Sequence, residues 1–139
     1  VFSNPKPVAV ILQPVTDGNR TGLVVAKRAI DPCAGEWSLI SGYMDHGDDD
    51  IFATAVREFK EETGLDLKQP LAICHNVNNH HGSVLTFVKT SEVMYYDEFL
   101  THTLCKENLE LDVMWKPSYY DLCFPLHKEI VEKWFKEML

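Results

Sequence analysis

Glutamates gather in one short segment of this 139-residue sequence. Glu58, Glu61 and Glu62 are spaced i, i+3 and i+4, so in a helix their carboxylates share one face. Like charges at this spacing cost roughly 0.2–0.5 kcal/mol per pair, and more where they converge in a cleft. A divalent cation would neutralise them. Oxygen ligands without cysteine or an obligatory histidine favour Mg²⁺, with Mn²⁺ as a substitute, over Zn²⁺.

The segment that must position these glutamates has the pattern of a helix from about residue 50 to residue 63. One of the aspartates at 48–50 suits the N-cap, and Gly64 suits the left-handed position that ends a helix. Apolar residues recur at helical spacing on the opposite face, where they would pack on a core: Phe52, Ala55, Val56 and Phe59. The acidic face is therefore either exposed or lines a cleft.

An acidic run on a helix is usually a solvated surface, and this reading stays open for the glutamates alone. The flanking residues make a more specific pattern. Residues 57–65 read R-E-F-K-E-E-T-G-L and fit R-E-U-x-E-E-x-G-U, where U is a bulky apolar residue. This pattern resembles the second half of the Nudix box, the motif of the Nudix hydrolase superfamily.

The first half of the box is altered. The family pattern begins G-x5-E-x7 before the arginine. Read without a gap, Tyr43 takes the place of the glycine and Asp49 that of the first glutamate. With one extra residue, Gly42 and Asp48 take those places, and we prefer this alignment. In either case an aspartate, one methylene shorter, replaces the glutamate.

The resemblance implies roles for residues of the box. Glu58, Glu61 and Glu62 would be metal ligands together with Asp48, and Glu62 would lie closest to the attacking water. Glu61, Glu62 and Arg57 would belong to the catalytic machinery. Arg57 would orient a carboxylate of the box through a bidentate pair instead of binding the substrate.

Residues outside the box complete the predicted site. The general base is a box glutamate or a carboxylate from a distant loop, where the candidates are Glu107 and Glu110, each of which could equally be a solvated acid. The predicted substrate-binding residues are Arg28, Gly42, Tyr43 and Phe124. Arg28 and its neighbour Lys27 face the phosphates or form a solvated strand end. Tyr43, Phe124 and Phe2 stack on a base or belong to the core.

The resemblance implies metal-dependent hydrolysis of the pyrophosphate bond in a nucleoside diphosphate linked to another moiety. A weaker likeness to the ADP-ribose, NADH and FAD pyrophosphatases rests on Asn4-Pro5, the acidic stretch before Trp115, and Phe124-Pro125. The alternative is a Nudix-fold module that senses a nucleotide metabolite without cleaving it, as the altered first half of the box would allow. A purely structural domain explains the box least well.

Length and charge limit the number of domains and the classes of partner that are expected. The chain fits one Nudix domain over residues 1–139, with a single sizeable core. The formal net charge of −8 argues against nucleic acid or an anionic membrane as a standing partner. No apolar run approaches the roughly 20 residues that span a bilayer, and no signal-peptide pattern is present, so a cytoplasmic location is expected. Family likeness implies a homodimer that acts on a small-molecule nucleoside diphosphate derivative.

The cysteines are widely scattered. Cys33, Cys74, Cys105 and Cys123 form no C-x-x-C pair, so neither a zinc ribbon nor a disulfide framework is expected. Free thiols in a reducing cytoplasm are the simplest interpretation.

The remaining patterns predict an α+β fold, a Nudix-type α/β/α sandwich with a mixed β-sheet. Strands are expected at 8–12 and 23–26, joined as a hairpin, and at 37–40, 72–77, 84–88 and 107–115. An amphipathic helix is expected at 126–139, and residues 91–106 have no assignment. His80 and His81 lie in a polar turn, but adjacent residues on a strand point to opposite faces and rarely share a metal ion.

Overall fold

The computed structural model describes residues 6–78 and 82–138. Within these residues, eight strands form one mixed sheet in the order β5-β6-β1-β4-β3-β2-β7, and β8 pairs with β3. The strands are β1 (Lys6–Leu12), β2 (Pro14–Thr16), β3 (Thr21–Arg28), β4 (Trp37–Tyr43), β5 (Leu71–Asn78), β6 (Ser83–Thr90), β7 (Met94–Tyr95) and β8 (Asn108–Met114). The helices are α1 (Ile51–Thr63), α2 (Tyr96–Phe99) and α3 (Pro125–Met138).

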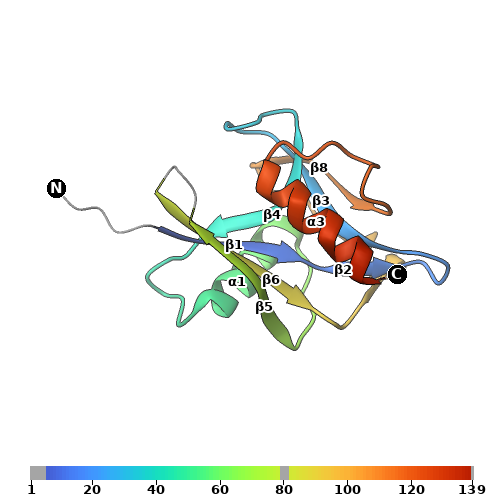
Figure 1. Ribbon diagram of the computed structural model, residues 1–139, viewed down its shortest axis with the longest axis horizontal. Coiled ribbons are helices and arrows are strands. Elements are labelled where there is room, and N and C mark those ends of the chain that lie inside the picture. The colour runs from blue at the N-terminus through green and yellow to red at the C-terminus, as the bar shows by residue number, and fades with distance from the viewer. Residues whose placement is uncertain (1–5, 79–81, 139) are drawn as a thin grey trace.

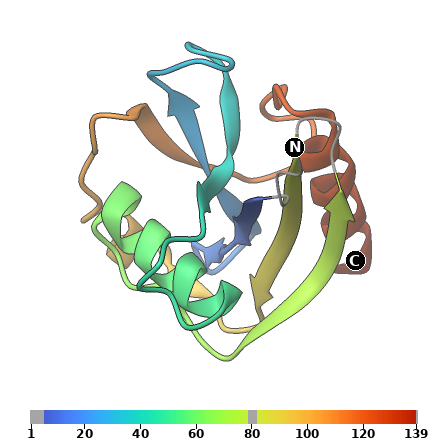
Figure 2. The same cartoon turned by 90° about the vertical axis from the view of Figure 1, so that its left-hand side faces the viewer.

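The long helices α1 and α3 lie on opposite sides of the sheet (Figures 1 and 2). Successive residues of a strand point to opposite faces, so β1 supplies both layers. Ala9 and Ile11 pack in the cluster that contains Phe59 of α1. Val8, Val10 and Leu12 pack in the cluster that contains Ile130, Val131 and Trp134 of α3. The predicted α/β/α sandwich with a mixed sheet is confirmed.

Helix α1 begins and ends where the sequence indicates. The N-cap is Asp50, whose carboxylate accepts a hydrogen bond from the Ala53 amide at 2.8 Å. Gly64 ends the helix with a φ of 74°, and its amide donates to the Lys60 carbonyl. Phe59 and Ala55 are fully buried against the sheet, and Glu62 of the glutamate face is buried as well.

The predicted hairpin between the first two apolar runs is wrong. β1 pairs antiparallel with β4 and parallel with β6, whereas the partner of β3 in the hairpin is the short β2. Because β1 is apolar on both faces, it is stable at the centre of the sheet, covered from both sides. Buried Gln13 connects β1 to β2; its side chain donates to the carbonyls of Pro14 and Glu92 and accepts from the Lys68 amide.

The unassigned stretch 91–106 contains β7 and the short helix α2. The two histidines of the polar turn, His80 and His81, lie outside the described residues, as does Phe2. None of the described helices combines the length and the apolar character needed to cross a membrane.

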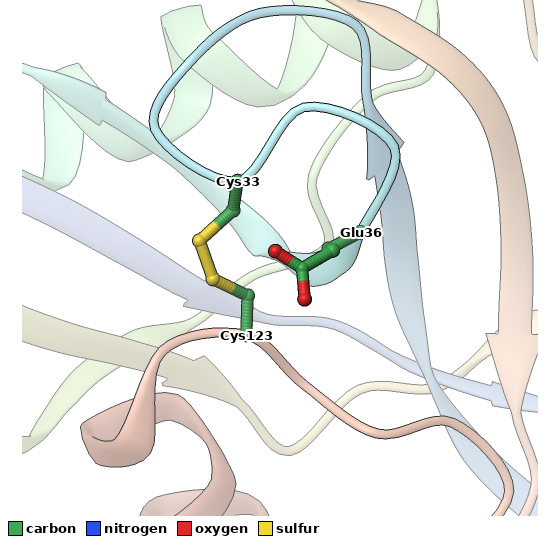
Figure 3. Close-up of side chains that lie close together, drawn as sticks. All are labelled: Cys33, Glu36 and Cys123. Atoms are coloured by element: carbon green, nitrogen blue, oxygen red, sulfur yellow. A yellow bond between two sulfur atoms is a disulfide. The ribbon is translucent and has the colours of Figure 1, made fainter.

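The prediction of free thiols is wrong for two of the cysteines. Cys33 and Cys123 form a disulfide with a Cα–Cα distance of 6.3 Å, whereas Cys74 and Cys105 are free. Figure 3 shows the carboxylate of Glu36 beside this bond. The two cysteines are 90 residues apart in sequence and meet only because the loop after β3 folds against the segment before α3. No local spacing pattern could have indicated the pair.

Candidate active site

A cavity of about 1280 Å³ lies beside the glutamate face of α1. It is lined by residues of β4, α1, the loop after β3, the segment before β8 and the first turn of α3. Eight of the residues predicted for the site line it: Arg28, Gly42, Tyr43, Glu58, Glu61, Glu62, Glu107 and Phe124. The fold thus brings the acidic helix face and the predicted substrate-binding residues to one place.

Glu62 is the most unusual residue of this cavity. Its side chain is buried, with 6% exposed, and Oε1 accepts a hydrogen bond from Asn108 Nδ2 at 3.3 Å. Among the described residues, no hydrogen-bond donor meets its other oxygen, Oε2. Burial raises the pKa of Glu62 to about 8, the charges of Glu58 and Glu107 add to this, and Asn108 opposes it. A buried carboxylate oxygen without a partner is costly, and a bound cation would satisfy it.

In the absence of divalent cations, the wild-type protein is expected to lose stability relative to Glu62→Gln as the pH rises from about 4.5 to about 8. The pKa of Glu62 is raised from 4.5 to about 8 in the folded protein, so the folded state binds more protons than the unfolded state over this range. The free energy of unfolding therefore falls with pH, by on the order of a few kcal/mol in total. Urea unfolding of both proteins in a chelator at pH 5, 7 and 9 measures the difference between their free energies of unfolding. A difference that stays constant with pH would contradict the raised pKa of Glu62.

Glu58 is packed against a glycine that leaves room for it. A Cβ atom on Gly42 would collide with the Glu58 carboxyl group, so a larger residue at this position would displace that side chain. Burial raises the pKa of Glu58, and the neighbouring Arg57 opposes this. The alignment with one extra residue stays a prediction; in the structure it is Gly42, the residue that it assigns to the box glycine, that contacts Glu58.

Arg57 donates hydrogen bonds to three carboxylates, those of Asp48, Glu58 and Glu61. Its Nε and Nη2 atoms each donate to one oxygen of Asp48 at 2.9 Å, which forms a bidentate pair. Its Nη1 atom donates to Glu58 Oε1 at 2.9 Å and to Glu61 Oε2 at 3.1 Å. Its Nη2 atom also donates to the Tyr43 carbonyl. The guanidinium therefore fixes the orientation of two of the three box glutamates.

Asp48 accepts hydrogen bonds from three residues. Besides the two bonds from Arg57, its carboxylate accepts hydrogen bonds from the Asp45 amide and from Thr54 Oγ1, both at 2.9 Å. The hydrogen bonds from Arg57 hold the pKa of Asp48 well below its usual range. Both oxygens of Asp48 therefore have protein donors, whereas Asp49 is exposed.

Among the other predicted residues, Glu110 is separate from the cavity. It is exposed on β8, opposite Lys27 in the register with β3, and is not one of the described residues that line the cavity. Arg28 lines the wall, donates to the Pro32 carbonyl at 2.7 Å and lies over the ring of Phe124 at 5.5 Å. Tyr43 lines the cavity but is 58% exposed.

The sequence did not single out three residues that line or support this site. Asn108 bonds Glu62, the free thiol of Cys105 lines the cavity, and His127 lines it from the first turn of α3. The acidic stretch before Trp115 indicated the region of Asn108, but an amide that bonds a glutamate 46 residues away has no local pattern. His127 occupies a helical position whose pattern indicates packing only.

The chain is similar to known proteins in sequence and in structure. The sequence matches the model of the NUDIX domain over residues 5–113. The structure is similar to the NUDIX domain of Shewanella oneidensis NrtR complexed with ADP ribose, at 16% identity and a TM-score of 0.81, over 99% of this chain and 91% of that chain. No curated protein sequence matches significantly.

Two further solved structures share the architecture. A C. elegans Ap4A hydrolase in a binary complex has 14% identity and a TM-score of 0.67, over 96% of this chain and 97% of that chain. The MutT protein from Methanosarcina mazei Go1 has 18% identity and a TM-score of 0.70, over 99% of each chain. At these identities the likeness establishes a shared fold.

Proposed function

This chain belongs to the NUDIX domain family, and on that premise we propose that it hydrolyses the diphosphate bond of a nucleoside diphosphate joined to another moiety, with Mg²⁺ or Mn²⁺ as the metal. The family match confirms the prediction of a Nudix hydrolase that was made from residues 57–65. The observation that supports the specific proposal best is the buried, unpartnered Oε2 of Glu62 in a cavity walled by acidic residues.

The donor set fits a hard divalent cation. Glu62 would offer Oε2, and Glu58 and Glu61 would each offer the oxygen that Arg57 does not hold. When bound, such an ion neutralises charge on the diphosphate oxygens and lowers the pKa of a coordinated water. Arg57 keeps the carboxylates oriented, and Asp48 in turn keeps Arg57 in place.

A general base outside the box is best sought at Glu107. It lines the cavity, and its charge raises the pKa of both Glu58 and Glu62, which places it in their electrostatic neighbourhood. Glu110, on the exposed surface of β8, has no comparable position, and we leave it out of the proposal. Glu107 or one of the box glutamates would accept the proton of the attacking water.

ADP-ribose is the first substrate to test, because the similar NrtR domain was solved with ADP ribose. Hydrolysis adds one water across the diphosphate and gives AMP and ribose 5-phosphate. Arg28 and Phe124 line the cavity on the side of the loop after β3 and of α3, where they can contact a phosphate and a flat ring. A panel of ADP-ribose, NADH, FAD and Ap4A with Mg²⁺ or Mn²⁺, followed by chromatography of the products, tests the proposal.

The panel also separates catalysis from sensing. Binding of ADP-ribose without turnover, by wild type and Glu62→Gln alike, would favour the sensor alternative over the hydrolase. The structure favours catalysis because the altered first half of the box still supplies a carboxylate to Arg57, at Asp48. The homodimer and the absence of a nucleic-acid partner remain predictions from family likeness and from the net charge of −8.

Asp48→Asn is expected to weaken Mn²⁺ binding roughly 10–100-fold, as for the loss of a group that orients metal ligands. The amide cannot accept both hydrogen bonds of the Arg57 fork, so Glu58 and Glu61 lose their fixed orientation. Asp49→Asn, at the exposed neighbouring position, is the matched control and should change the affinity less than twofold. Equal effects of the two substitutions, measured by titration with Mn²⁺, would refute the role given to Asp48.

A further inference from the structure

His127 is a buried histidine that lines the cavity. It is the third residue of α3 and only 3% exposed. Its ring lies edge-on to Phe87, with centroids 5.9 Å apart, and packs against Phe124 at 4.8 Å. Its Nδ1 atom accepts a hydrogen bond from the Leu39 amide of β4 at 3.3 Å. These contacts fix the orientation of the ring.

The bond from Leu39 determines which nitrogen of His127 holds the proton. A ring nitrogen that accepts a backbone N–H carries no proton, so the neutral ring is protonated on Nε2. Burial lowers the pKa of His127 to about 3, and the charge of Arg28 adds to this, so the ring is neutral at physiological pH. Nε2–H is therefore a fixed neutral donor.

Among residues 6–78 and 82–138, no acceptor is recorded for this donor. None of the hydrogen bonds among the described residues involves His127 Nε2, and His127 lines the large cavity. Glu62 Oε2 is the side-chain atom of the described residues that is both fully enclosed and unpartnered, so an Nε2 without a partner keeps some accessible surface. For a ring that is 3% exposed, that surface faces the cavity. A buried N–H without an acceptor is unfavourable, and a ligand atom in the cavity would relieve it.

The position of His127 indicates which part of a ligand it meets. His127 is bonded to Leu39, whereas Glu58 packs on Gly42, three residues further along β4. Three residues of a strand span about 10 Å, which separates the points of β4 at which His127 and Glu58 are held. The cavity walls near it are aromatic and aliphatic, with Phe124 and Leu126 from the same chain segment. Such walls suit a flat nucleobase.

We infer that His127 is a specificity-determining residue whose Nε2–H donates a hydrogen bond to a ring nitrogen or carbonyl oxygen of the substrate's nucleobase. This inference rests on the proposed function for the identity of the ligand. A site that makes such a bond rejects a base that presents a donor at the same point, because two donors would then face each other without an acceptor.

Two substitutions at this position distinguish the role of Nδ1 as an acceptor from the role of Nε2 as a donor. His127→Asn places an amide oxygen where Nδ1 accepts from Leu39 but removes the distal donor, and His127→Gln places a donor near Nε2. The probe is whichever of AMP, GMP, CMP and UMP the wild type binds most tightly, and ribose 5-phosphate is the probe without a base. Calorimetric titration should show that His127→Asn weakens binding of the nucleotide about tenfold and of ribose 5-phosphate less than twofold. His127→Gln should recover part of the nucleotide affinity.

Equal weakening of both probes, or no weakening of either, would overturn the inference. If His127→Asn does not fold, a long-range ¹H–¹⁵N correlation spectrum of the wild type decides instead. It should show Nε2 protonated, with a signal that shifts on addition of the nucleotide and not of ribose 5-phosphate; an unprotonated Nε2 or an unmoved signal overturns the inference. Both measurements require binding but no catalysis. Recognition of the base without turnover would refute the proposed hydrolase activity and leave this inference standing. Turnover without any effect of the His127 variants would refute this inference and leave the proposed activity standing.

Discussion

Replacing Glu62 by glutamine is expected to lower the rate of diphosphate hydrolysis at least about a hundredfold, as for the loss of a principal electrostatic stabiliser. Glutamine keeps the size of the side chain and the hydrogen bond with Asn108, but it removes the negative charge from the oxygen that has no partner within residues 6–78 and 82–138. The measurement is kcat/KM for ADP-ribose at saturating Mg²⁺.

The matched control for this experiment is Glu129→Gln, an exposed glutamate of α3 outside the cavity, which should change the rate less than twofold. Circular dichroism of both variants checks that the fold is intact. A Glu62→Gln enzyme that turns over at nearly the wild-type rate with Mg²⁺ would refute the assignment of Glu62 as a metal ligand.

Loss of the disulfide between Cys33 and Cys123 is expected to lower the free energy of unfolding by about 2–4 kcal/mol. The bond links positions 90 residues apart, so its removal greatly increases the conformational freedom of the unfolded chain. Urea unfolding of the wild type with and without a thiol reductant, and of the Cys33→Ser/Cys123→Ser double variant, measures the effect.

Cys74→Ser is the control for this second prediction, because Cys74 is a free thiol and half-buried. The reductant should destabilise Cys74→Ser as much as the wild type and leave the double variant unchanged. Equal unfolding curves for oxidised and reduced wild type would contradict a stabilising role of the bond.

The parts of the fold that depend on local sequence were predictable. Helix α1 follows from apolar residues at helical spacing and from the capping residues Asp50 and Gly64, all within about fifteen positions of one another. The box pattern also indicated that Arg57 binds a carboxylate. It did not indicate which carboxylate, because Asp48, the residue that pairs with Arg57 in the structure, was expected as a metal ligand.

The parts that depend on contacts between distant segments were not predictable from one sequence. β1 pairs with β4 and β6 at the centre of the sheet, where both of its faces are buried. The residues next to β1 in sequence do not indicate these partners. The bond from Asn108 to Glu62 and the bond from Leu39 to His127 join residues 46 and 88 positions apart. The sequence therefore indicated four of the carboxylates that line the cavity, Glu58, Glu61, Glu62 and Glu107, but not that Glu62 is buried with one oxygen unpartnered among the described residues.

Titration with Mn²⁺, followed by electron paramagnetic resonance of the free ion, tests most directly whether the glutamates of α1 hold a divalent cation. We expect the wild type to remove Mn²⁺ from the free signal in a saturable manner, Mg²⁺ to compete for the same site, and Glu62→Gln to bind at least tenfold more weakly. If Mn²⁺ stays free in the presence of wild-type protein and ADP-ribose, or binds equally to the variant, the account of this site is wrong.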